Sequence, residues 1–157
     1  MRLYVMRHGP AEDSAPSRRD FDRTLSAAGR EVVKATAEDL LRLRGEPIAR
    51  ILSSPLLRAR ETAEIVSVVA GEGPESMDLH DELGADQPVP LGLVQRLLVA
   101  STDALLVGHQ PSVEMLVRHL CPESGPHFAK GFQTAMVVTL ERVADAWSLG
   151  SVLRRLG

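Results

Sequence analysis

Residues 3–10, LYVMRHGP, contain four apolar residues followed directly by Arg7, His8 and Gly9. A short apolar run bounded by Gly9 and Pro10 predicts a buried strand over residues 3–6 that ends in a turn. In open α/β sheets, ligands bind beyond the carboxyl ends of the strands. The two side chains that leave this strand are therefore the first candidates for a functional site.

The rest of the chain repeats a strand-then-helix pattern. Ser26 is a good N-cap for a helix that ends at Gly45, and Ser54 and Pro55 are typical of the start of a second helix, which runs to about residue 70. Further helices are predicted over residues 91–100 and from the turn after Gly108 to about residue 120. Strands are predicted over residues 48–53, 77–79, 104–107, 135–140 and 147–153, the last two as a possible hairpin. This alternation predicts the α/β class, with a mostly parallel central sheet in a three-layer α/β/α sandwich.

Length and composition indicate one globular domain over residues 1–157, with 44% apolar and 25% charged residues. No apolar run reaches the roughly 20 residues that a membrane-spanning helix needs, and no secretory signal opens the chain. Cys121, the one cysteine, cannot form an internal disulfide, so we expect a reducing, cytoplasmic location. The net charge of −3 provides no field that would attract nucleic acid or an anionic membrane.

Cationic or imidazole groups follow three of the predicted strands. Arg7 and His8 follow the first, Arg58 lies in the first turn of the helix after the second, and His109 follows the strand over residues 104–107. Each alone has an ordinary structural explanation, such as a solvated arginine or a hydrogen-bonded core histidine. Together, beside the amino ends of two helices, they predict a pocket for a compact, multiply charged anion, and phosphate fits best.

Six segments carry a family resemblance: VMRHGPAE, RTLSAAGR, ILSSPLLRARETA, LHDEL, LLVGHQP and AMVVTL. In this order they resemble the histidine phosphatase superfamily, also called the phosphoglycerate-mutase-like superfamily, over nearly the whole chain. The small size, the RTLSAAG segment and the lack of a long insertion after LHDEL are most similar to the SixA-type phosphohistidine phosphatases. The resemblance implies a phosphoglycerate-mutase-like fold.

The resemblance also implies a role for each residue of the pocket. His8 is the nucleophile that forms a phosphohistidine intermediate, Arg7 and Arg58 bind the phosphoryl oxygens, and His109 donates to one of them. A neutral imidazole is a competent nucleophile near pH 7, and nearby guanidinium groups disfavour its protonation. The resemblance implies neither a metal nor another cofactor.

The proton donor to the leaving group is an open question at this stage. Glu82 best matches the position of the general acid in the ester-cleaving branches, and Asp81 is its rival. Glu12 and Asp13, shortly after His8, are further candidates, although both also suit a solvated loop. A phosphoramidate such as phosphohistidine depends less on this acid, because a protonated imidazole leaves readily.

Two further polar residues have competing interpretations. Arg23 can reach the phosphate or pair with Asp20 or Asp22, and we favour the ion pair. His80 could join His8 and His109 around a metal, but the spacing is not that of a metal site and the arginines would repel a cation.

We expect an enzyme that removes phosphate from phosphohistidine on a protein substrate, and we expect it to be a monomer. The alternatives are a small-molecule phosphomonoesterase, a mutase, and a phosphate-binding module without activity. A mutase is disfavoured because short loops offer little cover for a retained intermediate. A binding module is disfavoured because it has no need of a nucleophile.

Overall fold

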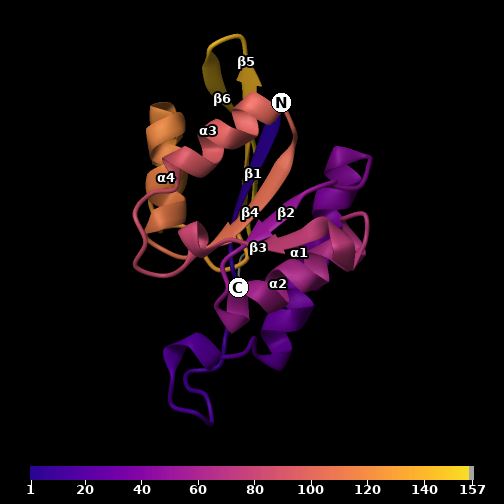
Figure 1. Ribbon diagram of the computed structural model, residues 1–157, viewed down its shortest axis with the longest axis vertical. Helices are drawn as coiled ribbons and strands as arrows, with labels where there is room; N and C mark the ends of the chain where they lie inside the picture. The colour runs from indigo at the N-terminus through magenta and orange to yellow at the C-terminus, as the bar shows by residue number, and fades with distance from the viewer. Residues whose placement is uncertain (156–157) are drawn as a thin grey trace.

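A six-stranded sheet forms the centre of the computed structural model, which describes residues 1–155 (Figure 1). The strand order is β3-β2-β4-β1-β5-β6. The first four strands are parallel, and β5 and β6 are antiparallel to their neighbours. The strands are β1 (Arg2–Arg7), β2 (Ile51–Ser53), β3 (Met77–Leu79), β4 (Ala104–Gly108), β5 (Val137–Val143) and β6 (Ala146–Leu153).

Helices cover both faces of the sheet, which confirms the predicted α/β/α sandwich with its mostly parallel sheet. In Figure 1, α1 (Ala27–Arg44) and α2 (Leu57–Val69) lie on one side, and α3 (Leu91–Ala100) and α4 (Ser112–Leu120) lie on the other. Short 3-10 helices are η1 (Asp20–Asp22), η2 (Pro74–Ser76), η3 (Asp81–Leu83) and η4 (Pro122–Phe128). Within residues 1–155, no helix combines the length and apolar character that crossing a membrane requires.

The continuous apolar run in β1 reflects burial on both faces of the sheet. Leu3 and Val5 pack into the cluster under α3 and α4, whereas Tyr4 and Met6 pack into the cluster under α1 and α2. Side chains of a strand alternate between the two faces, so a central parallel strand needs apolar residues at every position. Polar residues therefore begin only where β1 reaches its carboxyl end.

The register of the three central strands brings their carboxyl ends together. Arg7 of β1 pairs with Gly108 of β4, and Ser53 of β2 pairs with Val107 of the same strand. The residues that follow these pairs leave the sheet at one place. Three separate segments thus contribute His8, Ser54 and His109 to a single polar centre.

Several predicted element boundaries differ from the structure. Helix α2 begins at Leu57 instead of Pro55, because Leu56 is still extended with ψ 139° and Ser54 does not cap the helix. Strand β2 begins at Ile51 instead of residue 48, which makes only an isolated bridge. Strand β5 begins at Val137 because Ala135 adopts a left-handed conformation with φ 60°. The predicted hairpin of the last two strands is confirmed.

The amino end of α1 is attached to the turn that follows His8. The side chain of Ser26 accepts a hydrogen bond from the backbone N–H of Gly29 at 2.9 Å, as expected of an N-cap, and the N–H of Ser26 donates to the carbonyl of Pro10 at 3.1 Å. A Cβ atom at Gly29 would lie 2.0 Å from that carbonyl oxygen. The close approach of helix and loop therefore requires glycine at this position.

We predict that Gly29→Ala destabilises the fold by about 1–3 kcal/mol or more, because the new methyl group would push the Pro10 loop away from α1. Gly92→Ala is the matched control, since its Cβ would meet only the end of the Arg96 side chain at 3.6 Å. That change should be neutral or stabilising, as alanine is the better helix former. Thermal and urea unfolding of both variants measure the difference. Equal stability of the two variants would contradict the close contact.

Candidate active site

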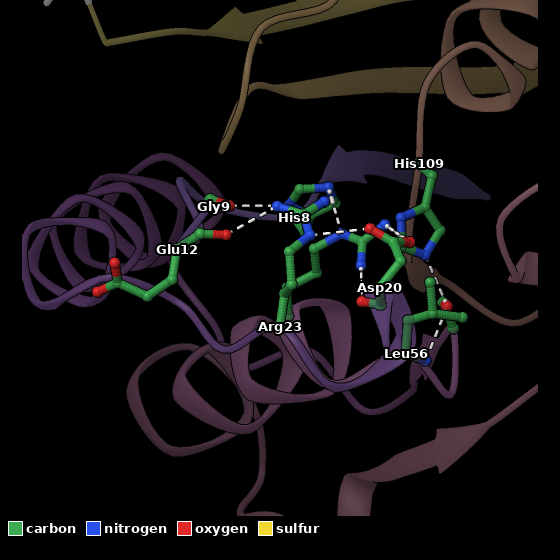
Figure 2. Close-up of polar contacts among 9 residues, drawn as sticks. His8, Gly9, Glu12, Asp20, Arg23, Leu56 and His109 are labelled. Atoms are coloured by element: carbon green, nitrogen blue, oxygen red, sulfur yellow. Dashed lines mark hydrogen bonds and ion pairs between the residues drawn. The ribbon is translucent and has the colours of Figure 1, made fainter. Parts of the chain in front are cut away.

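His8 stands directly after β1 with one ring nitrogen bonded to its own turn. The backbone N–H of His8 donates to the carbonyl of Gly108 at 3.1 Å, which holds the turn against β4. Its Nδ1 lies 2.7 Å from the carbonyl oxygen of Gly9 (Figure 2). A carbonyl oxygen can only accept, so Nδ1 carries the proton and Nε2 keeps its lone pair. The ring is therefore held in the tautomer that leaves Nε2 free to act as a nucleophile.

The protonation state of His8 also suits a nucleophile. The residue is only 7% exposed, and burial lowers its pKa to about 4. The hydrogen bond to Gly9 opposes this change, whereas the positive charges of Arg58 and Arg7 add to it. His8 is therefore neutral near pH 7.

Arg58 contacts both His8 and a loop far away in the sequence. It lies in the first turn of α2, is 5% exposed, and directs Nε to His8 Nε2 at 3.3 Å. Its Nη1 and Nη2 donate to the backbone carbonyl and the carboxylate of Asp20, at 2.9 and 3.1 Å. Asp20 thus holds the end of the guanidinium group and leaves the Nε side facing the imidazole.

The loop over residues 11–25 is held in place by side chains around Asp20. Arg23 donates to the Asp20 carboxylate at 2.8 Å and to the carbonyl of Glu12 at 2.9 Å (Figure 2). The hydrogen bond from Arg23 foremost, and then the charge and hydrogen bond of Arg58, lower the pKa of Asp20. Glu61 of α2 accepts from the N–H of Leu25 at 2.9 Å, so the loop is attached at its far end too. The predicted pairing of Arg23 with Asp20 is thus present.

His109 follows β4 and faces His8. The two ring centroids are 5.1 Å apart, and His109 is 5% exposed. Its Nε2 lies 2.7 Å from Oγ of Ser54, while its buried Nδ1 has no hydrogen-bond partner among the described residues. Burial lowers the pKa of His109 to about 3, and the electrostatic influence of His8 and the positive charge of Arg58 add to this effect. The second imidazole is thus neutral as well.

Arg7 approaches the pocket from the last position of β1. Its Nη1 donates to the carbonyl of Phe132 at 2.9 Å, and its buried Nε has no hydrogen-bond partner among residues 1–155. Burial and then the charge of Arg58 lower the pKa of Arg7. Two arginines and two neutral imidazoles at this end of the sheet are groups whose chemistry suits the binding of an oxyanion.

Glu82 lies beside His109, but its carboxylate is bonded to a residue outside the pocket. Glu82 belongs to η3, and its carboxylate is paired with Arg96 of α3. It lines a small apolar cavity together with His109 and Leu83, yet no hydrogen bond joins it to His8 or His109 in the described part of the chain. In this arrangement Glu82 neutralises Arg96.

The other acidic candidates lie outside the immediate surroundings of His8. Asp81 and Glu12 are exposed, and the Glu12 carboxylate points away from the imidazole in Figure 2. Asp13 lies in a shallow surface depression beside Arg18 and Asp20. Across residues 1–155, no group of three or more His, Cys, Asp or Glu side chains has the geometry to hold a metal ion, and this includes the set with His80 considered from the sequence.

Sequence reasoning missed the contact between Asp20 and Arg58 and the contact between Ser54 and His109. Asp20 was recognised only through its spacing from Arg23, because no local pattern reveals a bond to a residue 38 positions away. Ser54 was interpreted as a helix cap from its position before Pro55. Its side chain instead contacts His109.

Comparison with known proteins identifies the family of this chain. The family model of the histidine phosphatase superfamily (branch 1) matches residues 3–84. The phosphohistidine phosphatase SixA of Escherichia coli (strain K12) is 36% identical over 131 residues, which cover 80% of this chain and 78% of the relative.

Solved structures give the same result at the level of the fold. A structure of the protein histidine phosphatase SixA complexed with tungstate superposes with a TM-score of 0.81, at 27% identity over 98% of this chain and 96% of that chain. The mycobacterial glucosyl-3-phosphoglycerate phosphatase shares the fold, with a TM-score of 0.69 at 20% identity over 94% of this chain and 96% of the other. The chain therefore belongs to branch 1 of the histidine phosphatase superfamily. Within that branch it is a SixA-like enzyme.

We predict that the His8 and His109 rings stay neutral from pH 7.5 down to pH 5, because burial holds their pKa values at about 4 and about 3. An imidazole with the usual pKa of about 6.5 would be mostly protonated at pH 5. Ring 15N chemical shifts, assigned with His8→Ala and His109→Ala, measure the titrations. A midpoint near 6.5 for either ring would show that the site is less buried than the structure has it.

We predict opposite effects of Asp20→Ala on turnover and on phosphate binding. Without the Asp20 carboxylate, the Arg58 guanidinium keeps only its hydrogen bond to the backbone carbonyl of residue 20 and is held less firmly, so kcat with phosphoramidate should fall about fivefold or more. The removed negative charge leaves the pocket more positive, so inorganic phosphate should inhibit more strongly. Asp22→Ala is the matched control, because Asp22 lies in the same η1 and bonds Ser17 and Arg19 instead. A kcat equal to that of the control would show that Asp20 does not contribute to the site.

Proposed function

We propose that this enzyme hydrolyses phosphohistidine on a protein substrate, through a phosphohistidine intermediate on Nε2 of His8 and without a metal. The observation that carries the proposal is the state of His8. Its Nδ1 proton is bonded to Gly9, its Nε2 lone pair is 3.3 Å from Arg58 Nε, and it is neutral near pH 7.

In the first step, the Nε2 lone pair attacks phosphorus and the P–N bond of the substrate breaks. The substrate imidazole leaves with the electron pair of that bond and is neutral if its other nitrogen already holds a proton. Arg58 Nε, which donates to Nε2 in the free enzyme, can then donate to a phosphoryl oxygen instead. The arginine would thus follow the charge from the nucleophile to the phosphoryl group.

In the second step, water attacks phosphorus and the bond to His8 breaks. The proton on Nδ1, retained by the carbonyl of Gly9, allows His8 to depart as a neutral imidazole. A proton from the attacking water passes to solvent or phosphate, and inorganic phosphate is released. The same hydrogen bond would therefore serve both halves of the reaction.

The phosphoryl oxygens need donors that the protein has not already used. Arg7 Nε and His109 Nδ1 are both buried and have no hydrogen-bond partner among the described residues. A tetrahedral oxyanion at His8 would supply acceptors for both. Tungstate is such an oxyanion, and the similar SixA structure is a complex with it.

The arrangement of acidic groups favours a P–N substrate. An ester needs an acid to protonate its leaving oxygen, and such an acid contributes about 10²- to 10⁴-fold to the rate. Glu82 is paired with Arg96, and the pKa of Asp20 is lowered, so neither carboxyl is suited to give up a proton. An imidazole leaving group does not depend on such an acid.

The surface next to the pocket supports a protein as the carrier of the phosphate. Phe21 is 39% exposed and immediately follows Asp20, so an exposed apolar residue belongs to the loop that is bonded to Arg58. The name of the Escherichia coli relative, phosphohistidine phosphatase, points to the same substrate class.

We predict that kcat/KM is about 100-fold higher or more for a protein carrying phosphohistidine than for the same protein carrying phosphoserine, because only the ester requires a strong general acid. Release of inorganic phosphate from both substrates measures the ratio. A brief reaction with radiolabelled substrate should also leave an acid-labile, alkali-stable label on the enzyme.

His8→Ala should abolish both label and turnover, whereas His119→Ala, at an exposed histidine of α4, should alter neither. Preference for phosphoserine or for sugar phosphates would instead identify a phosphomonoesterase. Phosphate binding without label or turnover on any of these substrates would identify a binding module.

A further inference from the structure

The hydrogen bonds of Ser54 determine which nitrogen of His109 can carry a proton. Ser54 is fully buried directly after β2, and its Oγ lies 2.7 Å from His109 Nε2. The same oxygen accepts a hydrogen bond from the backbone N–H of Leu56 at 3.2 Å (Figure 2). Within residues 1–155, the only acceptor in contact with the Ser54 hydroxyl hydrogen is therefore His109 Nε2.

The opposite arrangement would leave the hydroxyl group unsatisfied. If Nε2 carried the proton and donated to Ser54, the serine oxygen would accept two hydrogen bonds, and its own hydrogen would be buried without an acceptor. Buried donors without partners are costly, which is why nearly all of them are paired in native structures. A neutral imidazole has one N–H and one lone pair, so an acceptor role for Nε2 places the proton on Nδ1.

The remaining nitrogen faces the nucleophile. In Figure 2 the ring of His109 lies opposite His8, with Nε2 turned to the bond at the Leu56 turn and the other nitrogen turned toward His8. The centroids of the two rings are 5.1 Å apart, and Arg58 donates a hydrogen bond to Nε2 of His8. A phosphoryl group on His8 Nε2 would come within reach of His109 Nδ1.

We propose that Ser54 is a positioning residue that fixes His109 as the Nδ1–H tautomer, so that an uncharged imidazole presents an N–H donor to the phosphoryl group. The part that concerns phosphate rests on the function proposed above. The other tautomer would present a lone pair to the phosphoryl oxygens and repel them. Ser54 would thus act on the reaction only through His109.

The low pKa of His109 agrees with this role. Burial lowers it to about 3, so the ring cannot become a donor at both nitrogens by taking up a second proton near pH 7. Neutral imidazole in water prefers the proton on Nε2. The serine would therefore select the less common tautomer, which a spectrum can distinguish from the form that prevails in water.

The closing experiment observes the ring nitrogens directly. Long-range 1H–15N spectra of the free wild-type enzyme at pH 7 should show His109 with Nδ1 protonated and Nε2 unprotonated, assigned through His109→Ala. In Ser54→Ala the proton should move wholly or partly to Nε2. The kcat/KM for phosphoramidate should fall about tenfold or more, as expected for the loss of one oxyanion donor.

Ser53→Ala is the matched control. Ser53 is equally buried and adjacent in the chain, but its hydroxyl donates to the carbonyl of Ser54 at 2.9 Å and does not touch His109. This variant should keep the wild-type tautomer and a kcat/KM within about twofold of wild type. A merely structural effect of losing a buried hydroxyl would be equal in both variants and would leave the tautomer unchanged.

The outcomes separate this inference from the proposed function. A proton on Nε2 of His109 in the wild-type enzyme overturns the role of Ser54, whether or not phosphohistidine is hydrolysed. A proton on Nδ1 that moves in Ser54→Ala supports it, even if the preferred substrate proves to be an ester. The spectra need no substrate, and once the His109 signals are assigned, the wild-type result alone can decide against the proposal.

Discussion

The hydrogen bond from His8 Nδ1 to the carbonyl of Gly9 is the interaction on which the chemistry proposed for this protein depends. It assigns the lone pair to Nε2, and burial beside two guanidinium groups keeps the ring uncharged. A site that attracts phosphate needs positive charge, whereas an imidazole that attacks phosphorus must be uncharged. Here the positive charge resides on Arg7 and Arg58, whose protons are not readily lost, and the two imidazoles remain neutral.

The architecture behind this hydrogen bond follows from the strand register. The pairing of Arg7 with Gly108 and of Ser53 with Val107 ends three strands at one level. This part of the structure was predictable, because apolar runs that end in RHG, SSP and GHQP segments indicate where parallel strands stop. Because ligands of α/β sheets bind at the carboxyl ends of such strands, the sequence predicts that Arg7, His8 and His109 lie together. The residues near the sheet could thus be identified from local pattern.

The parts that escaped prediction depend on contacts between distant segments. Ser54 before a proline has the pattern of a helix cap, but its hydroxyl has a competing partner in His109, and the helix starts three residues later. Asp20 lies in a polar loop without periodicity, so no sequence signal shows that it reaches Arg58. Glu82 has the sequence position of a general acid, yet its carboxylate is bonded to Arg96 of α3. In each case a partner far away in the chain decides the role of a polar side chain.

The way in which the loop over residues 11–25 is fastened has an evolutionary consequence. His8, Ser54 and His109 are placed by backbone pairing within the sheet, whereas Asp20 and Arg23 are held by side-chain bonds in a loop. Insertions or substitutions between residues 13 and 19 can thus remodel what approaches the phosphate without disturbing the groups that react with it. Related proteins with this arrangement can therefore evolve to accept different substrates while they inherit the same reacting groups.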